Sequence, residues 1–367
     1  EEDDEDSEKE EDGGDEPGVF AGRKKSAPSP GASDSKIWGL ETMVLRRLGN
    51  GWGVCKLITM WQMRLAVFAR EPHLVGETAL IRGVQASRSA TGIGHVGGNK
   101  GGLVVALTYG QVTLCFVSAH LAAHSHRLAA RHSNCQEILN ETRAHIGNSA
   151  LDVAHEFDHV IWMGDLNYRL QPDIHTGSRD GAGSSFGPGS FRADGGEAAS
   201  AAPAAADGAG GASHRRDSTK AKERKKLELA AHHATVTALA EASEWGALME
   251  IDQLTVCRER GEVFAGFVEG PIHWRPTFKV RRVGGLQYKD QRVPSYCDRV
   301  LWKSMPPLAH HLEQTEYRAV PEVSTSDHKP VLSAFTIRPP STPMQLTPAS
   351  DPNHGCARET ESSPPRP

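Results

Sequence analysis

Four short polar clusters lie at the ends of apolar runs in this chain, and their residue types could carry out hydrolytic chemistry. The clusters are SAHLAAH at 118–124, GDLNYR at 164–169, YCDRVLW at 296–302 and TSDHKPV at 325–331. Strand ends on a rigid scaffold are where binding and catalytic residues are commonly placed. Four such ends are more than chance usually supplies, so we expect them to contribute to one site.

The second cluster offers a carboxylate and an amide two positions apart, at Asp165 and Asn167. On an extended backbone both side chains project to the same side. Together they could bind a hard cation through oxygen or orient a water molecule. An Asx turn after a strand is the simpler interpretation of GDxN alone, and the neighbouring clusters favour the functional one.

Asp327 and His328 point to opposite sides if the chain is extended there. Asp327 could then ligate a metal while His328 faces a substrate, although an Asp-His pair is also common in surface turns. Asp298 begins an apolar strand, where an unpaired carboxylate is costly to bury. Pairing with His328 would satisfy it and stabilise the charged imidazole, and an ion pair with Arg299 is an equally good alternative.

His120, His124 and His126 form an HxxxHxH pattern. The HExxH signature of helical zinc sites is absent, so this pattern does not indicate zinc. We expect His124 and His126 to face solvent and His120 to meet the other clusters. The Gly-rich GIGHVGGNKGG at 92–102 does not fit a P-loop; it is either a flexible turn or a backbone that approaches a phosphate.

The elements that must position these clusters are mostly short strands rich in β-branched and aliphatic residues. Helical spacing of apolar residues appears at 121–146, with Arg131 off the apolar face, and again at 220–243. Locally paired strands with helices between some of them predict a layered α+β domain. The predicted strands are 54–60, 63–70, 103–109, 112–120, 159–165, 299–302 and 330–337.

Composition divides the chain into one domain and three segments that cannot pack. Residues 1–36 begin with twelve acids and one Lys in sixteen positions, and 339–367 lack any periodicity, so both are predicted to be disordered tails. Residues 176–219 are Gly, Ala and Ser without a pattern, which predicts a disordered insertion. One domain of 37–338 remains.

Without those first sixteen residues the chain has 34 acids and 40 bases, a mildly basic body that suits an anionic substrate or a membrane surface. The six Cys are scattered without a CxxC pair, which indicates reduced thiols in an intracellular protein. No apolar stretch approaches the roughly 18 residues of a membrane span. We therefore expect a cytoplasmic protein that touches membranes peripherally.

Taken together, the motifs resemble the catalytic domain of inositol polyphosphate 5-phosphatases, within the endonuclease, exonuclease and phosphatase superfamily. GDxN and SDH mark the superfamily, and the block RVPSYCDR narrows the resemblance. The resemblance implies a DNase I-like α/β fold, a two-sheet β-sandwich flanked by helices. The motifs occur in family order: TGIGHVGGNKGG, SAHLAAH, WMGDLNYRL, DQL, VFAGFVEGPIHWRPTFKV, RVPSYCDRVLW and TSDHKPV.

The resemblance implies Mg²⁺-dependent removal of the 5-phosphate from phosphoinositides, such as phosphatidylinositol 4,5-bisphosphate, or from soluble inositol polyphosphates, with no role for nucleic acid. Asp165 matches the residue that orients or deprotonates the attacking water, and Asn167 positions it. His328 matches the histidine that contacts the scissile phosphate, with Asp298 as its orienting partner. His120 matches a second phosphate-stabilising histidine.

Five further residues carry supporting roles in the resemblance. Lys279 and Arg292 match basic positions that hold the neighbouring 4-phosphate and so affect substrate choice. Asp327 lies on the metal side of the site. Asn99 and Arg299 are weaker matches on the substrate side, expected to support the site.

The chain departs from the family pattern before Ile37. The family has there a strand that ends in a Gln-Glu pair whose Glu ligates magnesium, whereas an acidic segment without a strand pattern occupies that place here. We therefore predict weak or absent activity of this chain as an N-terminally incomplete phosphatase. Alternatives are a non-catalytic phosphoinositide-binding or scaffold protein, and a nuclease or sphingomyelinase relative, against which the CDR block argues.

Overall fold

A five-stranded sheet forms the centre of the fold. The computed structural model describes residues 39–91, 100–148, 150–172, 174 and 211–338, with only the backbone of 211–219 and 221. The sheet order is β3-β4-β5-β6-β7, and only the β5–β6 pair is parallel. The strands are β3 (Ile81–Ala90), β4 (Gly101–Tyr109), β5 (Val112–His120), β6 (His159–Asp165) and β7 (Asp298–Ser304).

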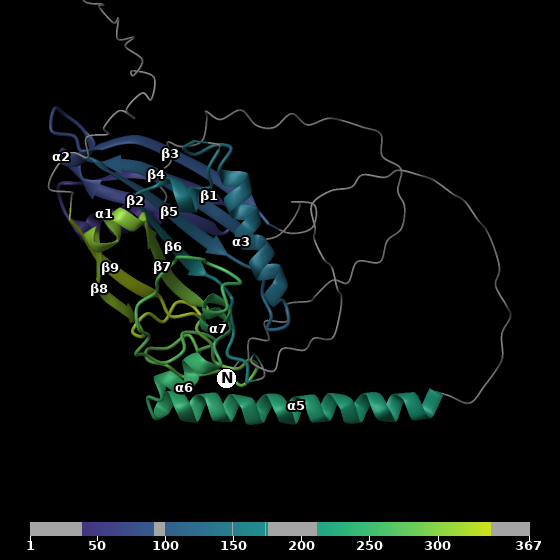
Figure 1. Cartoon of the computed structure of the whole chain (residues 1–367). Helices are drawn as coiled ribbons and strands as arrows, with labels where there is room; N and C mark the ends of the chain where they lie inside the picture. Colours follow the sequence, from purple (N-terminus) through teal and green to yellow (C-terminus); the bar gives the residue numbers. More distant parts are fainter. Residues whose placement is uncertain (1–38, 92–99, 149, 173, 175–210, 339–367) are drawn as a thin grey trace, which may run out of the picture.

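Two antiparallel hairpins form a second layer against this sheet (Figure 1). The first pairs β1 (Trp52–Met60) with β2 (Met63–Arg70), and the second pairs β8 (Leu312–Ala319) with β9 (Val331–Ile337). Apolar side chains from β1 and β2 pack directly on Leu103 and Val105 of β4. The predicted two-sheet sandwich is thereby formed.

Helices cover the opposite face of the five-stranded sheet. Val104 and Ala106 of β4 point to that face, because side chains alternate along a strand, and they join one apolar core with residues of the helices. The helices that contribute to this core are α3 (Leu128–Thr142), α4 (Val153–Glu156) and α7 (Gln253–Glu259). Both faces of β4 are therefore apolar, as expected for a central strand.

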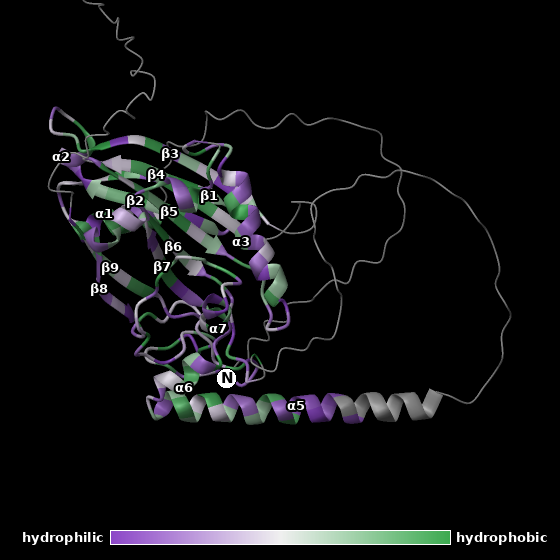
Figure 2. Cartoon of the chain, in the orientation of Figure 1, coloured by the Kyte–Doolittle hydropathy of each residue, from purple (hydrophilic) through white to green (hydrophobic). Residues whose placement is uncertain are grey.

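The remaining elements lie at the edges of the sandwich. Helix α5 runs along one end of the molecule and packs through its C-terminal part, where Val236 and Ala240 are buried. Figure 2 shows hydrophilic residues over the middle of α5 and hydrophobic ones toward α6. The elements are α1 (Gly39–Leu48), α2 (Glu71–Leu74), α5 (Gly211–Glu241), α6 (Trp245–Glu250) and the 3-10 helix η2 (Pro306–His311).

The structure confirms all seven predicted strands and adds two, β3 and β8. Both added strands are rich in polar residues, and in each the register shifts once against its partner, which obscures the two-residue alternation. The prediction that Arg131 lies off the buried face of its helix is wrong, since Arg131 is fully buried. Within the described residues, no helix is long and apolar enough to cross a membrane.

Most of the segments that were predicted to be disordered lie outside the described residues. The predicted tails 1–36 and 339–367 lie wholly outside the described residues, as do the first two residues of the predicted domain, 37 and 38. Of the predicted insertion 176–219, the part before Gly211 lies outside them as well. Helix α5 begins at Gly211, so the last nine residues of that segment are helical.

Candidate active site at the ends of three strands

The register of the central sheet aligns three polar side chains in one row. His120 ends β5 and is paired with Asp165, which ends β6; Asp165 is in turn paired with Asp298, which begins β7. Residues in register on neighbouring strands project to the same face of a sheet. The row therefore lies at one end of the sheet, on the face covered by the hairpins.

Asp165 lies at the centre of this row. Its Oδ2 is 3.2 Å from Nε2 of His120 and 4.0 Å from Nε2 of His328. Burial alone would raise the pKa of Asp165, but the hydrogen bond from His120 and the charges of His328, His120 and Lys100 outweigh burial and lower it. Asp165 is thus held as a carboxylate that can accept a proton.

The turn after β6 places Asn167 beside this carboxylate. Its backbone N–H donates to Oδ1 of Asp165 and its side-chain amide donates to Oδ2, both at 3.1 Å. Asn167 adopts a φ of 56°, a left-handed conformation that Asn tolerates better than most residues. The Asx turn is therefore real, and it is also the device that fixes Asp165.

Arg169 secures the other side of the same amide. Its guanidinium donates to Oδ1 of Asn167 at 2.5 Å and stacks over the ring of Phe278 at 4.5 Å. With that oxygen engaged, the amide group of Asn167 must point at Asp165. Strand β6 can approach β5 closely because Gly164 has no side chain: a Cβ there would lie 2.0 Å from the carbonyl oxygen of Ala119.

Asp298 and His328 form the predicted pair. Nδ1 of His328 lies 2.9 Å from Oδ2 of Asp298, and the hydroxyl of Thr277 donates to the same oxygen at 2.9 Å. Burial would lower the pKa of His328, but the hydrogen bond and charge of Asp298, with the charges of Asp165 and Asp327, raise it. His328 therefore presents Nε2 toward Asp165 as a charged donor.

Lys100 is a site residue that the motif search did not single out. Its Nζ lies 2.5 Å from Nε2 of His120. A single ring nitrogen cannot both accept from Lys100 and donate to Asp165, so the contact of His120 depends on which of its neighbours carries the proton. Burial lowers the pKa of Lys100, with Asp165 opposing the shift. The only sequence signal was a Lys within a Gly-rich stretch.

The predicted substrate and metal residues fall at different places. Lys279 forms an ion pair with Asp327 at 3.6 Å. The carboxylate of Asp327 thus engages a base, so its role at a metal stays a prediction. Arg292 is exposed, and Asn99 lies outside the described residues.

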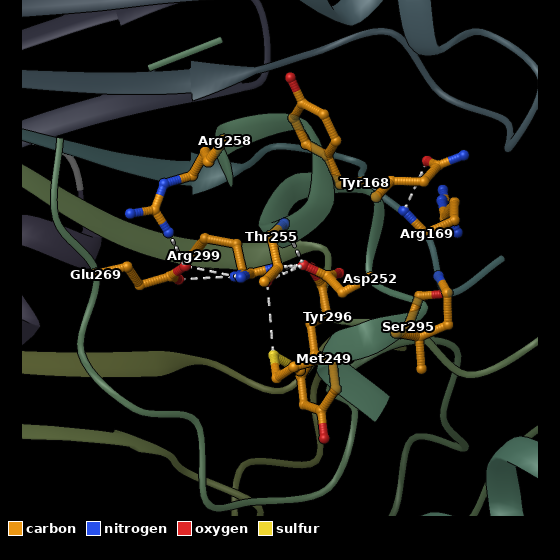
Figure 3. A network of polar contacts seen from close by, with 12 residues as sticks. Tyr168, Arg169, Met249, Asp252, Thr255, Arg258, Glu269, Ser295, Tyr296 and Arg299 are labelled. Atoms are coloured by element: carbon orange, nitrogen blue, oxygen red, sulfur yellow. Dashed lines mark hydrogen bonds and ion pairs between the residues drawn. The ribbon is translucent and has the colours of Figure 1, made fainter. Parts of the chain in front are cut away.

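Arg299 lies on the opposite face of β7 from Asp298 and is 1% exposed. Its guanidinium contacts Asp252 at 2.8 Å and Glu269 at 2.7 Å (Figure 3). Burial would lower the pKa of Arg299, but the two carboxylates raise it well above its usual value. The prediction that Arg299 binds substrate is wrong, because its guanidinium is buried and already bound to two carboxylates. The alternative that Arg299 neutralises Asp298 is wrong for the same reason.

The DQL motif at 252–254 supports the candidate site through buried contacts with residues next to it. Asp252 pairs with Arg299, and the fully buried Gln253 accepts from Arg131 at 2.5 Å and from the backbone of Arg169 at 3.0 Å. Arg131 also donates to the carbonyl of His124 at 2.6 Å. The motif thereby ties the chain that follows His120 to the chain that follows Asp165. Sequence spacing could not show the contact of Arg131 with Gln253, which lies 122 residues further along the chain.

The donor chemistry of the row fits a hard divalent cation. Ligand atoms of Asp165, Asp298 and His328 lie within 4.8 Å of one another. The described hydrogen bonds use three of the roughly four lone-pair positions of Asp165, and those of Asp298 fall on Oδ2. Carboxylate oxygens with a position to spare are the ligands that Mg²⁺ prefers.

Comparison with known proteins places this geometry in a family. The chain matches the model of endonuclease/exonuclease/phosphatase family 2 over residues 47–180 and 226–334. Phosphatidylinositol 3,4,5-trisphosphate 5-phosphatase 2B of Danio rerio is 28% identical over 76% of this chain. Phosphatidylinositol 3,4,5-trisphosphate 5-phosphatase 2 of Homo sapiens is 26% identical over the same share. The chain spans 18% of the length of each relative.

Solved structures confirm the expected fold. The inositol polyphosphate 5-phosphatase domain of a synaptojanin, solved with inositol (1,4)-bisphosphate and a calcium ion, superposes with a TM-score of 0.51 at 21% identity, covering 79% of this chain and 65% of that one. A Cimex nitrophorin mutant solved as a ferrous NO complex superposes with a TM-score of 0.50 at 17% identity, covering 81% and 78%. The fold is DNase I-like, and by itself it does not define a reaction.

Proposed function

The chain belongs to the endonuclease/exonuclease/phosphatase family 2, and on that premise we propose that it hydrolyses the 5-phosphate of phosphoinositides or soluble inositol polyphosphates. The 5-phosphatase names of its relatives support this substrate class. The observation that carries the proposal is the row of His120, Asp165 and Asp298 across three strands, with His328 closing it.

The row suits the hydrolysis of a phosphate monoester. Phosphoryl transfer needs a water aligned with the phosphorus and positive charge at the phosphate oxygens, and no covalent nucleophile is required. Asp165, oriented by Asn167, accepts the proton of that water. His328, charged through Asp298, donates to a phosphate oxygen. Lys100 and His120, which share a proton between Nζ and Nε2, lie at the same end of the sheet and can donate to the phosphate.

Mg²⁺ is the cofactor that we propose for this site, held by the carboxylate oxygens of Asp165 and Asp298. When bound there it would neutralise charge on the phosphate, a contribution typically worth several kcal/mol in metal-assisted hydrolysis.

Substrate choice would rest on the basic residues beside the row. Lys279 lies in the strand-like segment that carries Thr277 and Phe278, both of which contact the Asp298–His328 pair. We propose that the phosphate adjacent to the scissile one draws Lys279 from Asp327 and also engages Arg292. The protein would meet membrane-bound substrate peripherally, on the cytoplasmic side.

Phosphate release tests this proposal. The full chain is incubated with Mg²⁺ and either phosphatidylinositol 4,5-bisphosphate vesicles or a soluble inositol polyphosphate, and Asp165→Asn serves as the control. We expect slow 5-phosphate release by the wild type and none by Asp165→Asn. Equal release by both proteins contradicts the proposal. Vesicle binding without turnover by the wild type favours the non-catalytic alternative.

A further inference from the structure

A second cluster of metal-ligand residues lies outside the candidate active site. His132 on α3, Cys257 on α7 and Glu262 just after α7 bring ligand atoms within 4.8 Å of one another. Cys257 is fully buried in the core on the helix-covered face of the sheet, whereas Glu262 is exposed. The candidate active site lies on the other face.

One atom of this cluster lacks a partner. Nε2 of His132 is buried and has no hydrogen-bond partner among the described residues. A buried polar atom without a partner costs free energy, and native structures rarely leave one unexplained. The ring is held in place by packing on Tyr168, with centroids 6.0 Å apart. A bound cation would satisfy this nitrogen.

The loop after α7 holds the other two ligands together. The backbone N–H of Glu262 donates to the carbonyl of Cys257 at 2.9 Å. The carboxylate of Glu262 and the thiol of Cys257 lie within 4.8 Å of each other. Arg260 lies 3.9 Å from Glu262 on the exposed side. That contact is long and solvent-exposed, so it is too weak to hold the carboxylate away from an ion.

We propose that His132, Cys257 and Glu262 bind Zn²⁺, with solvent as the fourth ligand on the side of Glu262. Sulfur and imidazole nitrogen favour zinc, whereas Mg²⁺ requires oxygen ligands. Ligand atoms around tetrahedral zinc lie about 3.5 Å apart, so the side chains close by about 1 Å on binding. On binding, the thiol of Cys257 loses its proton to solvent and forms the zinc–sulfur bond.

The position of this site links it to the residues behind the active site. His132 follows Arg131 on α3, and Cys257 lies one turn after Gln253 on α7. Arg131 and Gln253 are hydrogen-bonded to each other and to the loops behind His120 and Asn167. Zinc therefore fastens α3 to α7 beside the contact that orders the candidate active site. The inference itself does not depend on the proposed activity.

Cobalt substitution tests the site directly. The full chain is freed of metal, reduced and titrated with Co²⁺, whose charge-transfer absorption reports a thiolate ligand, and then with Zn²⁺ as competitor. We expect one equivalent per chain to give this absorption and Zn²⁺ to raise the melting temperature. Cys257→Ser abolishes the absorption, and the exposed Glu262→Gln weakens affinity at least about tenfold, a typical loss when a metal site is impaired.

Two controls separate this site from others. Cys55→Ser, which changes a thiol on β1, and Asp165→Asn, which changes the candidate active site, should both leave the absorption unchanged. Absorption that survives in Cys257→Ser overturns the assignment, as does a wild type without it. Because Glu262 is exposed, Glu262→Gln tests the site even if Cys257→Ser fails to fold, and unchanged affinity in that variant also overturns the proposal.

Discussion

Asp298 and Arg299 are neighbours on β7, yet their side chains lie on opposite faces of the sheet and in different environments. The side chain of Asp298 is 19% exposed and meets His328 at the candidate active site. The side chain of Arg299 is 1% exposed and is enclosed by two carboxylates on the other face of the sheet. One residue of offset along a strand reverses the face, so an adjacent acid and base need not form a pair.

The two faces also treat charge differently. At the candidate site the charged groups keep access to solvent, and hydrogen bonds and neighbouring charges lower the pKa of Asp165 and raise that of His328. Around Arg299 the charges are paired inside the protein: its guanidinium binds Asp252 at the start of α7 and Glu269, which holds β7 to α7 (Figure 3). Access to water therefore distinguishes the candidate active site from the buried ion pairs around Arg299, although the residue types are similar.

The largest effect is expected when the buried ion pairs of Arg299 are removed. Arg299→Met leaves Asp252 buried without its cation and leaves Glu269 with Arg258 as its ion-pair partner, which should reduce the free energy of unfolding by about 3–5 kcal/mol. Urea denaturation measures the loss. Arg318→Met is the matched control, because Arg318 pairs with Glu316 at the surface and should change stability by less than about 1 kcal/mol. Equal losses in the two variants would refute the distinction.

Asp165→Asn tests the solvent-accessible candidate active site. The amide keeps the shape of the carboxylate but accepts no proton, so kcat for phosphate release should fall by about 10²–10⁴-fold, the usual range for loss of a general base. Circular dichroism and urea denaturation should match the wild type. A variant that unfolds like Arg299→Met would show that Asp165 is structural.

Asp298→Asn sharpens the role of the neighbouring pair. Asp298 raises the pKa of His328 against the effect of burial, so without its charge the pKa should fall and His328 should lose its proton at lower pH. The high-pH limb of the kcat/KM profile then moves to lower pH, and kcat/KM above neutrality falls. An unmoved limb would mean that His328 does not act in its charged form.

The smallest effect concerns the edge of the site. Lys279→Ala and Arg292→Ala should raise KM for a 4,5-bisphosphorylated substrate by about tenfold each, since one charge-assisted hydrogen bond contributes about 1.5–3 kcal/mol, and leave kcat nearly unchanged. Lys226→Ala, on the exposed part of α5, is the control. A fall in kcat as large as that of Asp165→Asn would move these residues into the reacting centre.

The sequence by itself determined the strands at the centre of the sheet and the polar residues at their ends. Alternating and continuous apolar runs are local signals, so β4, β5 and β6 were predictable. The residues alone left Asp298 with two possible partners, His328 and Arg299, and the family resemblance indicated His328. β3 and β8 were missed because polar residues and register shifts hide their period. The family motifs likewise indicated the reaction class before any geometry.

Only the tertiary structure decided which side chains meet across the fold. Several findings depend on segments that are far apart in the chain. They are the burial of Arg131 and Arg299, the contact of Lys100 with His120 and the proximity of His132 to Cys257. Such contacts depend on sheet register and helix packing, which local periodicity does not specify. A charged residue that looks available in the sequence can therefore be the most enclosed residue of the folded protein.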